Sequence, residues 1–458
     1  MVARITDSTL YAHLWGTDEL RAVFDERARL QSWLDILAAL AAAQAELDLV
    51  PADAATAIAA TADVNRLDLA AVAAHTRESG HSTLGLIRVL REQLPEHARE
   101  YVYYGATVQD LTDTWMSLAM RSVGAVCWRD LRAAEAAALD LAAQHRDTHM
   151  VGRTHGQPGA PITFGFKAAS WADEMRRHLD RLTDGAPRWL VGQLAGAVGT
   201  LAFFGESGVA LRERFCARLG LADPGISWLS SRDRVAEFLG VLAMITATLG
   251  RIGNEVAQLQ RAEIAELREP MPPGAVGSIT MPHKRNPELG EHLVTLSRVV
   301  RAQANLVVEG MVAEHERDGR GWKAEWVAFP EACLCTGAAL AGAGRLLVGL
   351  EVDPAAMTAT IVRQQGYVGS ERILASVAAR VGKHRAQELL QEALRRGTEQ
   401  RVPIATALTE AGAALELPAD ELATLVAEPP DPGSAGAMVD SVLARAREAR
   451  ADEHSEWP

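Results

Sequence analysis

Residues 235–259, VAEFLGVLAMITATLGRIGNEVAQL, carry the clearest structural pattern in the chain. Its large apolar side chains recur at steps of three and four residues, which places them on one stripe of an α-helix. The stripe consists of Val235, Phe238, Leu242, Ile245, Leu249, Ile252, Val256 and Leu259. A helix of about 30 residues, roughly 45 Å long, is therefore predicted, and we expect the helical pattern to end near Leu267. Helices of this length are typical of an extended bundle.

A second segment, residues 289–311, repeats the same spacing. Its stripe consists of Leu289, Leu293, Leu296, Val300, Val307 and Met311. Small residues lie off both stripes, among them Gly250, Gly253 and Ala304, so each helix can pack closely on more than one neighbour. This favours a bundle shared between subunits, with close packing inside an alanine-rich monomer as the alternative.

Composition favours helices along the whole chain. Aromatic residues make up only 5% and β-branched runs are scarce, whereas alanine, leucine and arginine dominate. No linker, low-complexity tract or repeat divides the 458 residues. We expect an all-α protein with an N-terminal helical domain (1–109), a central helical bundle (110–350) and a C-terminal helical domain (351–458). The pair Asp353-Pro354 marks the last boundary.

Charge and cysteine content narrow the class of partner. The formal charge of -13 argues against a nucleic-acid binder, so an anionic substrate would need a local positive pocket. The four cysteines lack zinc spacing, and we expect them to be small buried residues in a reducing compartment. No apolar leader follows Met1, and uncharged stretches such as 238–250 are shorter than the roughly 20 residues of a membrane span. A soluble, cytoplasmic protein is predicted, with no nucleic-acid or membrane partner.

One loop, over about residues 269–286, concentrates reactive groups. It contains the run Gly277-Ser278-Ile279-Thr280-Met281-Pro282-His283-Lys284-Arg285-Asn286-Pro287, and Glu291 follows. Pro270 and its neighbours end the preceding helix, whereas Pro287 suits the first turn of the next. Lys284 and Asn286 then precede a helix N-terminus, a place that favours an anion. On these residues alone, a solvated connector is an equally good interpretation.

The run resembles the signature of the fumarase/aspartase superfamily, Gly-Ser-Ser-x-Met-Pro-x-Lys-x-Asn followed by Glu, with Ile279 in place of the second serine. Residues 105–114 and 152–165 are similar to two further superfamily blocks, Gly-x-Thr-Ser-x-Asp-x-x-Asp-Thr and Gly-Arg-Thr-His. Segments within 24–31, 196–200 and 314–326 look like the branch of 3-carboxy-cis,cis-muconate cycloisomerase and adenylosuccinate lyase, the former being nearer. The resemblance covers nearly the whole chain. It implies a homotetramer whose central helices combine, active sites that each collect residues from three chains, and no metal or cofactor.

The resemblance also implies the chemistry, an anti elimination beside a carboxylate through an aci-carboxylate intermediate. Removing the proton adds a second negative charge, so fixed donors such as Lys284 and Asn286 are the main requirement. Ser278 is the predicted base, acting as an alkoxide after the loop closes. His155, expected at a helix start, would serve the leaving group or orient a carboxylate, and Glu291 could hold its tautomer. The residues expected to bind the small anionic carboxylate substrate are Thr107, Arg153, Thr154, Gln157, Lys284, Asn286, His81 and, as a weaker candidate, Arg317.

Taken singly, these residues have ordinary interpretations as well. Ser278 could bond its own backbone in a turn, and His81 could be an exposed polar residue. Val108 replaces the serine that usually follows Thr107, and residues 7–11 lack the Arg-Tyr pair with which adenylosuccinate lyases approach a nucleotide phosphate. A small dicarboxylate or tricarboxylate is therefore favoured over a nucleotide.

The leading prediction is a lyase that cleaves a C–N (or C–O) bond of a substituted succinate, of amino- or nitro-succinate type, and releases fumarate. Retention of His155 motivates it. The alternatives are a lactonising cycloisomerase, supported by residues 314–326, and an adenylosuccinate lyase. A non-catalytic relative, like the lens crystallins related to argininosuccinate lyase, is disfavoured because Ser278, Lys284 and Asn286 are intact.

Overall fold

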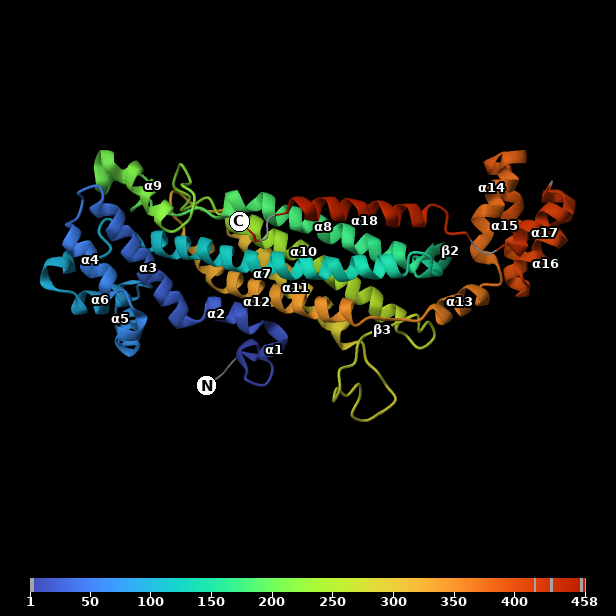
Figure 1. Ribbon diagram of the computed structural model, residues 1–458, viewed down its shortest axis with the longest axis horizontal. Helices are drawn as coiled ribbons and strands as arrows, with labels where there is room; N and C mark the ends of the chain where they lie inside the picture. The colour runs from blue at the N-terminus through green and yellow to red at the C-terminus, as the bar shows by residue number, and fades with distance from the viewer. Residues whose placement is uncertain (1–3, 416, 429–430, 454–455, 458) are drawn as a thin grey trace.

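The chain forms an elongated, almost wholly helical molecule. The computed structural model describes residues 4–415, 417–428, 431–453 and 456–457. Long helices run along the long axis, the N-terminal helices gather at one end, and the helices of residues 370–427 lie at the other (Figure 1). The prediction of an all-α fold with a long central bundle is confirmed.

The bundle is built from long helices that pack side by side. They are α7 (Val108–Gln144), α8 (Phe164–Trp189), α10 (Asp233–Leu259), α11 (Glu288–Glu309) and α12 (Gly319–Val348). With 37 residues, α7 is about 55 Å long at the usual rise per residue. It therefore separates the segments at its two ends by that distance.

The expected continuation of the helix to Leu267 is wrong, because α10 ends at Leu259. After it the chain turns back: Ala265 has a φ of 55° and the Glu266 amide donates to the Leu259 carbonyl over 3.0 Å. Leu267–Arg268 then forms β3, which pairs antiparallel with β4 (Glu351–Val352). The apolar spacing continued past the helix because Leu267 is itself fully buried.

Shorter helices form the N-terminal part of the chain. They are α1 (Ala12–Trp15), α2 (Asp18–Phe24), α3 (Glu26–Ala45), α4 (Ala52–Thr61), α5 (Leu69–Ser79) and α6 (Leu84–Gln93), with α9 (Gly208–Arg218) beside them. The longest, α3, starts where it does because the Asp25 carboxylate accepts from the Arg27 and Ala28 amides. Its apolar face contacts α4, α7 and α9.

The C-terminal part has an apolar cluster of its own. This part of the chain contains α13 (Pro354–Arg363), whose Met357 belongs to the main core, and then α14 (Ser370–Val381), α15 (Lys383–Gln400), α16 (Ile404–Ala411) and α17 (Ala419–Ala427). Val377, Leu390 and Leu408 belong to this cluster. The last helix, α18 (Ala435–Asp452), instead returns along the bundle and packs on α8, and its Val439 belongs to the main core. The division into three domains stays a proposal.

The two most apolar helices owe their composition to burial in the core. By length and composition α10 and α12 could each cross a membrane, yet 67% and 61% of their most apolar windows are buried inside the structure, as is usual for core helices. All four cysteines are buried free thiols, as expected. In two of them, Cys216 and Cys335, burial raises the pKa to about 12, so both remain protonated thiols at neutral pH.

Candidate active site

The loop that carries the signature is held firmly at its stem. The Glu269 carboxylate accepts from the Leu289 and Gly290 amides over 2.9 and 2.5 Å, so it caps the start of α11. Gln260 joins the two sides of the stem, accepting from the Glu269 amide at 2.7 Å and donating to the Arg285 carbonyl at 3.1 Å. The stem is thereby fixed to α10 and α11.

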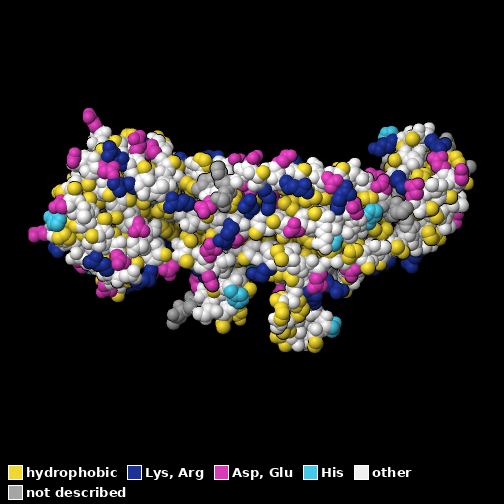
Figure 2. Space-filling view, viewed as in Figure 1, with side chains coloured by type: hydrophobic (Ala, Val, Ile, Leu, Met, Phe, Trp, Pro, Cys, Tyr) yellow, Lys and Arg dark blue, Asp and Glu magenta, His cyan; other side chains and the backbone are white. Residues whose placement is uncertain are grey.

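Beyond the stem the loop projects away from the bundle (Figure 1). In Figure 2 the same projection shows many apolar side chains; Ile279, in place of the signature's second serine, is 95% exposed. Gly277 is required where the two sides of the loop approach, because a Cβ there would lie 2.4 Å from the Lys284 carbonyl oxygen. The loop is thus compact at its neck and exposed at its tip.

Of the predicted catalytic groups of the loop, Lys284 is exposed, whereas Ser278 and Asn286 are half-buried. The Ser278 hydroxyl accepts from the Met281 amide at 3.1 Å, and the Asn286 amide donates to Glu288 at 3.4 Å. Lys284 is exposed, and within the residues that the structure describes its ammonium bonds to none. Pro287, expected in the first turn, lies one position earlier as the N-cap of α11. Lys284 and Asn286 therefore precede the helix N-terminus as predicted.

His155 occupies a hairpin rather than the predicted helix start. Strand β1 (His149–Thr154) pairs antiparallel with β2 (Gln157–Thr163), and the two turn residues His155 and Gly156 have φ values of 53° and 75°. Such a two-residue turn requires positive φ at both positions, which the His-Gly pair could have signalled. The imidazole is exposed, and no ion pair or hydrogen bond to Glu291 occurs in the part of the chain described. Within the described residues of one chain, Glu291 therefore does not hold the His155 imidazole, contrary to the expectation.

Arg153 and its neighbours lie on the same hairpin. The Arg153 guanidinium donates to both oxygens of the fully buried Glu266 carboxylate, over 2.9 and 2.7 Å. Because Glu266 directly precedes β3, this pair joins the hairpin to the stem of the loop. Thr154 and Gln157 are exposed, so their donors are available to a ligand. Substrate binding by all three stays a prediction.

At the other end of α7 the structure brings two predicted residues together. The Arg317 guanidinium donates to the Thr107 hydroxyl and to the Gln109 side-chain oxygen, each over 2.7 Å. Thr107 is the N-cap of α7, and Arg317 lies in the connection between α11 and α12. Gln109 was missed by the sequence reasoning, although it stands in the same block as Thr107. We call Thr107, Gln109 and Arg317 the arginine corner.

A buried carboxylate organises this corner. Asp110 accepts from the Thr107 amide at 2.8 Å and from the Ala195 and Gly196 amides at 2.8 and 3.3 Å. Burial raises the pKa of Asp110 to about 7, against the effect of these three donors. Thr107 is thereby locked to the segment that contains Gly196, so the corner is set by contacts between distant parts of the chain.

His81 lies at the same end of the molecule as the arginine corner. Its side chain is exposed, and its Nδ1 accepts weakly from the Thr83 amide at 3.4 Å. The half-buried Tyr103 connects this segment to the corner, because its phenol lies near the Thr83 and Thr107 side chains. His81 is therefore placed near Thr107 and far from His155.

A single chain separates the predicted site residues into two groups. Thr107, Arg317 and His81 lie at the start of α7, whereas the hairpin with His155 follows its end, about 55 Å away along the helix. The loop with Ser278 projects on the hairpin side of the molecule. No single chain can therefore close these groups around one small substrate.

Comparison with known proteins gives a consistent set of relatives. A family profile described as a lyase matches residues 15–302. N-acetyl-S-(2-succino)cysteine lyase of Dickeya dadantii is 39% identical over 97% of this chain and 98% of that protein. The 3-carboxy-cis,cis-muconate cycloisomerase of Pseudomonas aeruginosa is 37% identical over 93% and 94%. The crystal structure of a fumarate lyase from Mesorhizobium sp. BNC1 has 31% identity and a TM-score of 0.85, covering 97% of this chain and 99% of the other.

Proposed function

The chain belongs to the fumarase/aspartase superfamily of lyases, and from that premise we propose that it eliminates a leaving group from a small 2-substituted succinate and releases fumarate. The observation that carries the proposal is the loop: Ser278, Lys284 and Asn286 are all retained on an exposed segment that ends at the N-terminus of α11. A helix N-terminus with an ammonium and an amide beside it favours a developing dianion.

The proposed reaction divides the work between two groups. Ser278, as an alkoxide, removes the proton from the carbon beside one carboxylate, and the electron pair forms the aci-carboxylate. Lys284, Asn286 and the backbone amides of the loop stabilise the added charge. The electron pair then forms the carbon–carbon double bond while the bond to the leaving group breaks. His155 donates a proton to the departing atom or positions the carboxylate next to it.

For the departing atom, the relatives favour sulfur. A succino group on the sulfur of N-acetylcysteine, the substrate in the name of the Dickeya dadantii relative, would give fumarate and a free thiol by this elimination. The expected C–N cleavage uses the same proton abstraction and differs only in the atom that departs. We therefore propose a thioether substrate first and an amino- or nitro-succinate second.

The proposed active site is shared between subunits. Because the arginine corner and the hairpin lie at opposite ends of α7, a site that uses both must take them from different chains. A homotetramer with its long helices side by side would meet this condition. In that assembly the projecting loop of a further chain would cover the substrate.

A cycloisomerase is the second candidate. It is favoured by the 37% identity to the Pseudomonas aeruginosa enzyme and by Trp322, Glu325 and Trp326, which resemble residues of that branch. Such an enzyme would catalyse an intramolecular addition and release neither fumarate nor thiol. An adenylosuccinate lyase is less well supported because residues 7–11 lack the Arg-Tyr pair.

The deciding experiment supplies the purified protein with S-(2-succino)-N-acetylcysteine, with aspartate and nitrosuccinate, and with 3-carboxy-cis,cis-muconate. Fumarate is followed by its ultraviolet absorbance and the thiol by a thiol-reactive dye. Equal amounts of fumarate and thiol from the first compound are expected. Turnover of carboxymuconate without fumarate from any substituted succinate would reject the proposal.

A further inference from the structure

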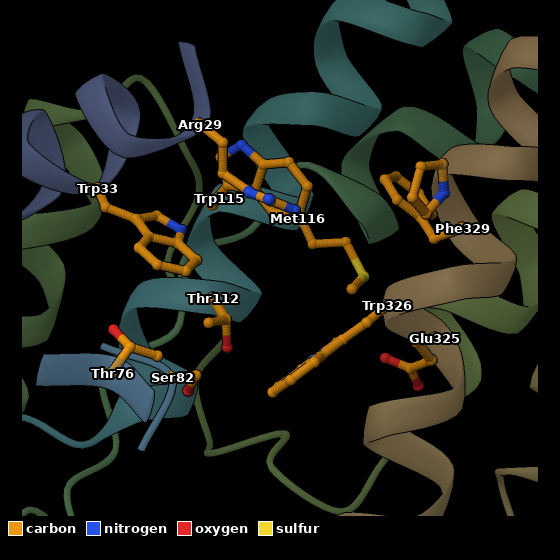
Figure 3. Close-up of a pocket in the computed structure, with 11 residues that line it drawn as sticks. Arg29, Trp33, Thr76, Ser82, Thr112, Trp115, Met116, Glu325, Trp326 and Phe329 are labelled. Atoms are coloured by element: carbon orange, nitrogen blue, oxygen red, sulfur yellow. The ribbon is translucent and has the colours of Figure 1, made fainter. Parts of the chain in front are cut away.

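A cavity of about 270 Å³ lies at the N-terminal end of the bundle, among α3, α5, α7 and α12. Figure 3 shows Trp33, Thr76 and Ser82 on one side, Trp326, Glu325 and Phe329 on the other, and Arg29 with Trp115 above them. Ser82 and Trp326 are partly exposed, so a ligand can reach the cavity from the surface. Its volume is below that of sites for drug-sized ligands, which indicates room for a molecular fragment.

Arg29 brings an uncompensated positive charge to this cavity. Its guanidinium stacks on the rings of Trp115 and Trp33, at 5.6 and 6.0 Å from their centroids. Within the described residues it takes part in no hydrogen bond or ion pair. The nearest acids on the same helix, Asp25 and Glu26, are exposed. A half-buried arginine without a carboxylate partner is a site for an anion.

A second donor near Arg29 also lacks a partner. Trp33 is only 9% exposed, and its indole nitrogen is buried with no acceptor in the part of the chain that the structure describes. Buried indole N–H groups usually find a partner. The hydroxyls of Thr76 and Ser82 lie on the same side of the cavity. An anion bound there would accept hydrogen bonds from both the Arg29 guanidinium and the Trp33 indole N–H.

Glu325, the one carboxylate among the described residues that line the cavity, already has a partner. Glu325 receives hydrogen bonds from the buried Arg232, one of them at 2.9 Å, and Arg232 also pairs with Asp113 at 2.8 Å. Glu325 therefore does not compensate Arg29.

The cavity adjoins the arginine corner. Ser82 follows His81 directly, and Thr112 and Trp115 lie five and eight residues after Thr107 on α7, roughly 8 and 12 Å along the helix. Trp326 lies near the start of α12, just after the connection that carries Arg317. A substrate held at the corner could therefore extend one end into the cavity.

We propose that this cavity binds the leaving group and selects one that carries a carboxylate beside an apolar part, with Arg29 and Trp33 binding the carboxylate and Trp326 and Phe329 packing on the apolar part. This inference rests on the proposed function and adds the chemical class of the departing thiol or amine. In this proposal Arg29 determines which leaving group binds and does not contact the reacting atoms.

The test compares two leaving groups that differ only in charge, N-acetylcysteine and its carboxamide, each bound through sulfur to a 2-succino group. Arg29→Met should lower kcat/KM for the acid by roughly 10- to 100-fold and leave the amide within about twofold. The matched control is Arg27→Met, because Arg27 lies on the same helix with its side chain exposed and bonded to Asn65. Equal losses for both conjugates, or no loss for either, would overturn the proposal.

A binding measurement separates this inference from the proposed function. S-methyl-N-acetylcysteine, which cannot be eliminated, is titrated into the intact protein and followed by calorimetry. Weakened binding in Arg29→Met supports the cavity even when no conjugate releases fumarate. If Arg29→Met does not fold, as judged by circular dichroism, Arg29→Gln replaces it in both assays. No binding to the wild-type protein, or unchanged binding to the variant, counts against the proposal.

Discussion

Ser278 is half-buried, next to the neck of the loop at Gly277. Its hydroxyl accepts only from the Met281 amide within the described structure, as a turn serine does. In this conformation the hydroxyl is therefore not yet placed to act as a base, and closure of the loop must bring it to the substrate. We therefore expect a substitution of Ser278 to affect catalysis without affecting folding.

Ser278→Ala should reduce kcat by about a thousandfold, because loss of a general base costs 10²- to 10⁴-fold. The melting temperature should change little, because the variant loses only one hydrogen bond, from the Met281 amide. Thr280→Ala is the matched control, because it removes a hydroxyl from the same loop at a position that the signature leaves open. A Ser278→Ala enzyme that keeps its full rate would remove this serine from the mechanism.

At the scale of elements, α10 and α11 meet through two glycines. A Cβ at Gly290 would lie 2.5 Å from the Gly253 carbonyl oxygen and 2.9 Å from the Glu269 carboxylate that caps α11. The close approach of the helices and the anchoring of the loop stem therefore depend on one missing side chain.

Gly290→Ala should lower the free energy of unfolding by about 1–3 kcal/mol, because overpacking forces the two helices apart. Chemical denaturation measures the change. Gly369→Ala is the control, because Gly369 has a negative φ and no atom within 4 Å of an added Cβ. Equal stability of both variants would show that α10 and α11 adapt without cost.

A buried histidine couples α8 to α10. His178 Nε2 lies 2.8 Å from the Thr248 hydroxyl, and Arg181 lies 3.1 Å from its Nδ1. Burial, with the nearby Arg181 charge, lowers the pKa of His178 to about 4 from an ordinary 6.5. Between these values the unfolded chain binds a proton that the folded chain does not. The stability contributed by the neutral ring is therefore complete above pH 6.5 and is lost as the pH falls through 4.

His178→Gln should flatten the fall in stability between pH 6.5 and 4 by an amount on the order of 3 kcal/mol, at 1.36 kcal/mol per pKa unit. Thermal unfolding of both proteins across this range measures the slopes. Identical slopes would mean that His178 does not control the acid sensitivity of this contact.

Across the whole molecule, the predicted site residues lie far apart, and this separation determines how the proposed sites must be assembled. The arginine corner and the hairpin stand at opposite ends of α7, so one chain contributes to several proposed sites. Two chains with different defects should then restore some sites when they assemble together.

Coexpression of Ser278→Ala chains with Arg317→Met chains should give activity well above that of either variant alone. Mixed assemblies would contain sites in which the loop and the arginine corner are both intact. The control pairs Ser278→Ala with Lys284→Met, because two defects in the same loop cannot complement each other. Sedimentation of the active species as a monomer, or no recovery in the first mixture, would contradict the shared site.

The resemblance of several motifs indicated the family, and local spacing in the sequence was enough for the long helices and for the loop before α11. These features depend on residues within a few turns of each other, where periodicity and the φ preferences of proline and glycine act directly. The same reasoning misjudged the end of α10, because Leu267 continues the apolar spacing from a buried strand.

The contacts between residues far apart in the sequence could be seen only in the folded chain. Arg317 reaches Thr107 across 210 positions of sequence, and Arg153 reaches Glu266 across 113. Arg29 faces α7 and α12 in a cavity that none of the sequence motifs predicts. Such contacts depend on how whole helices pack, and that packing is set by the sum of many apolar contacts rather than by the neighbours of any one residue.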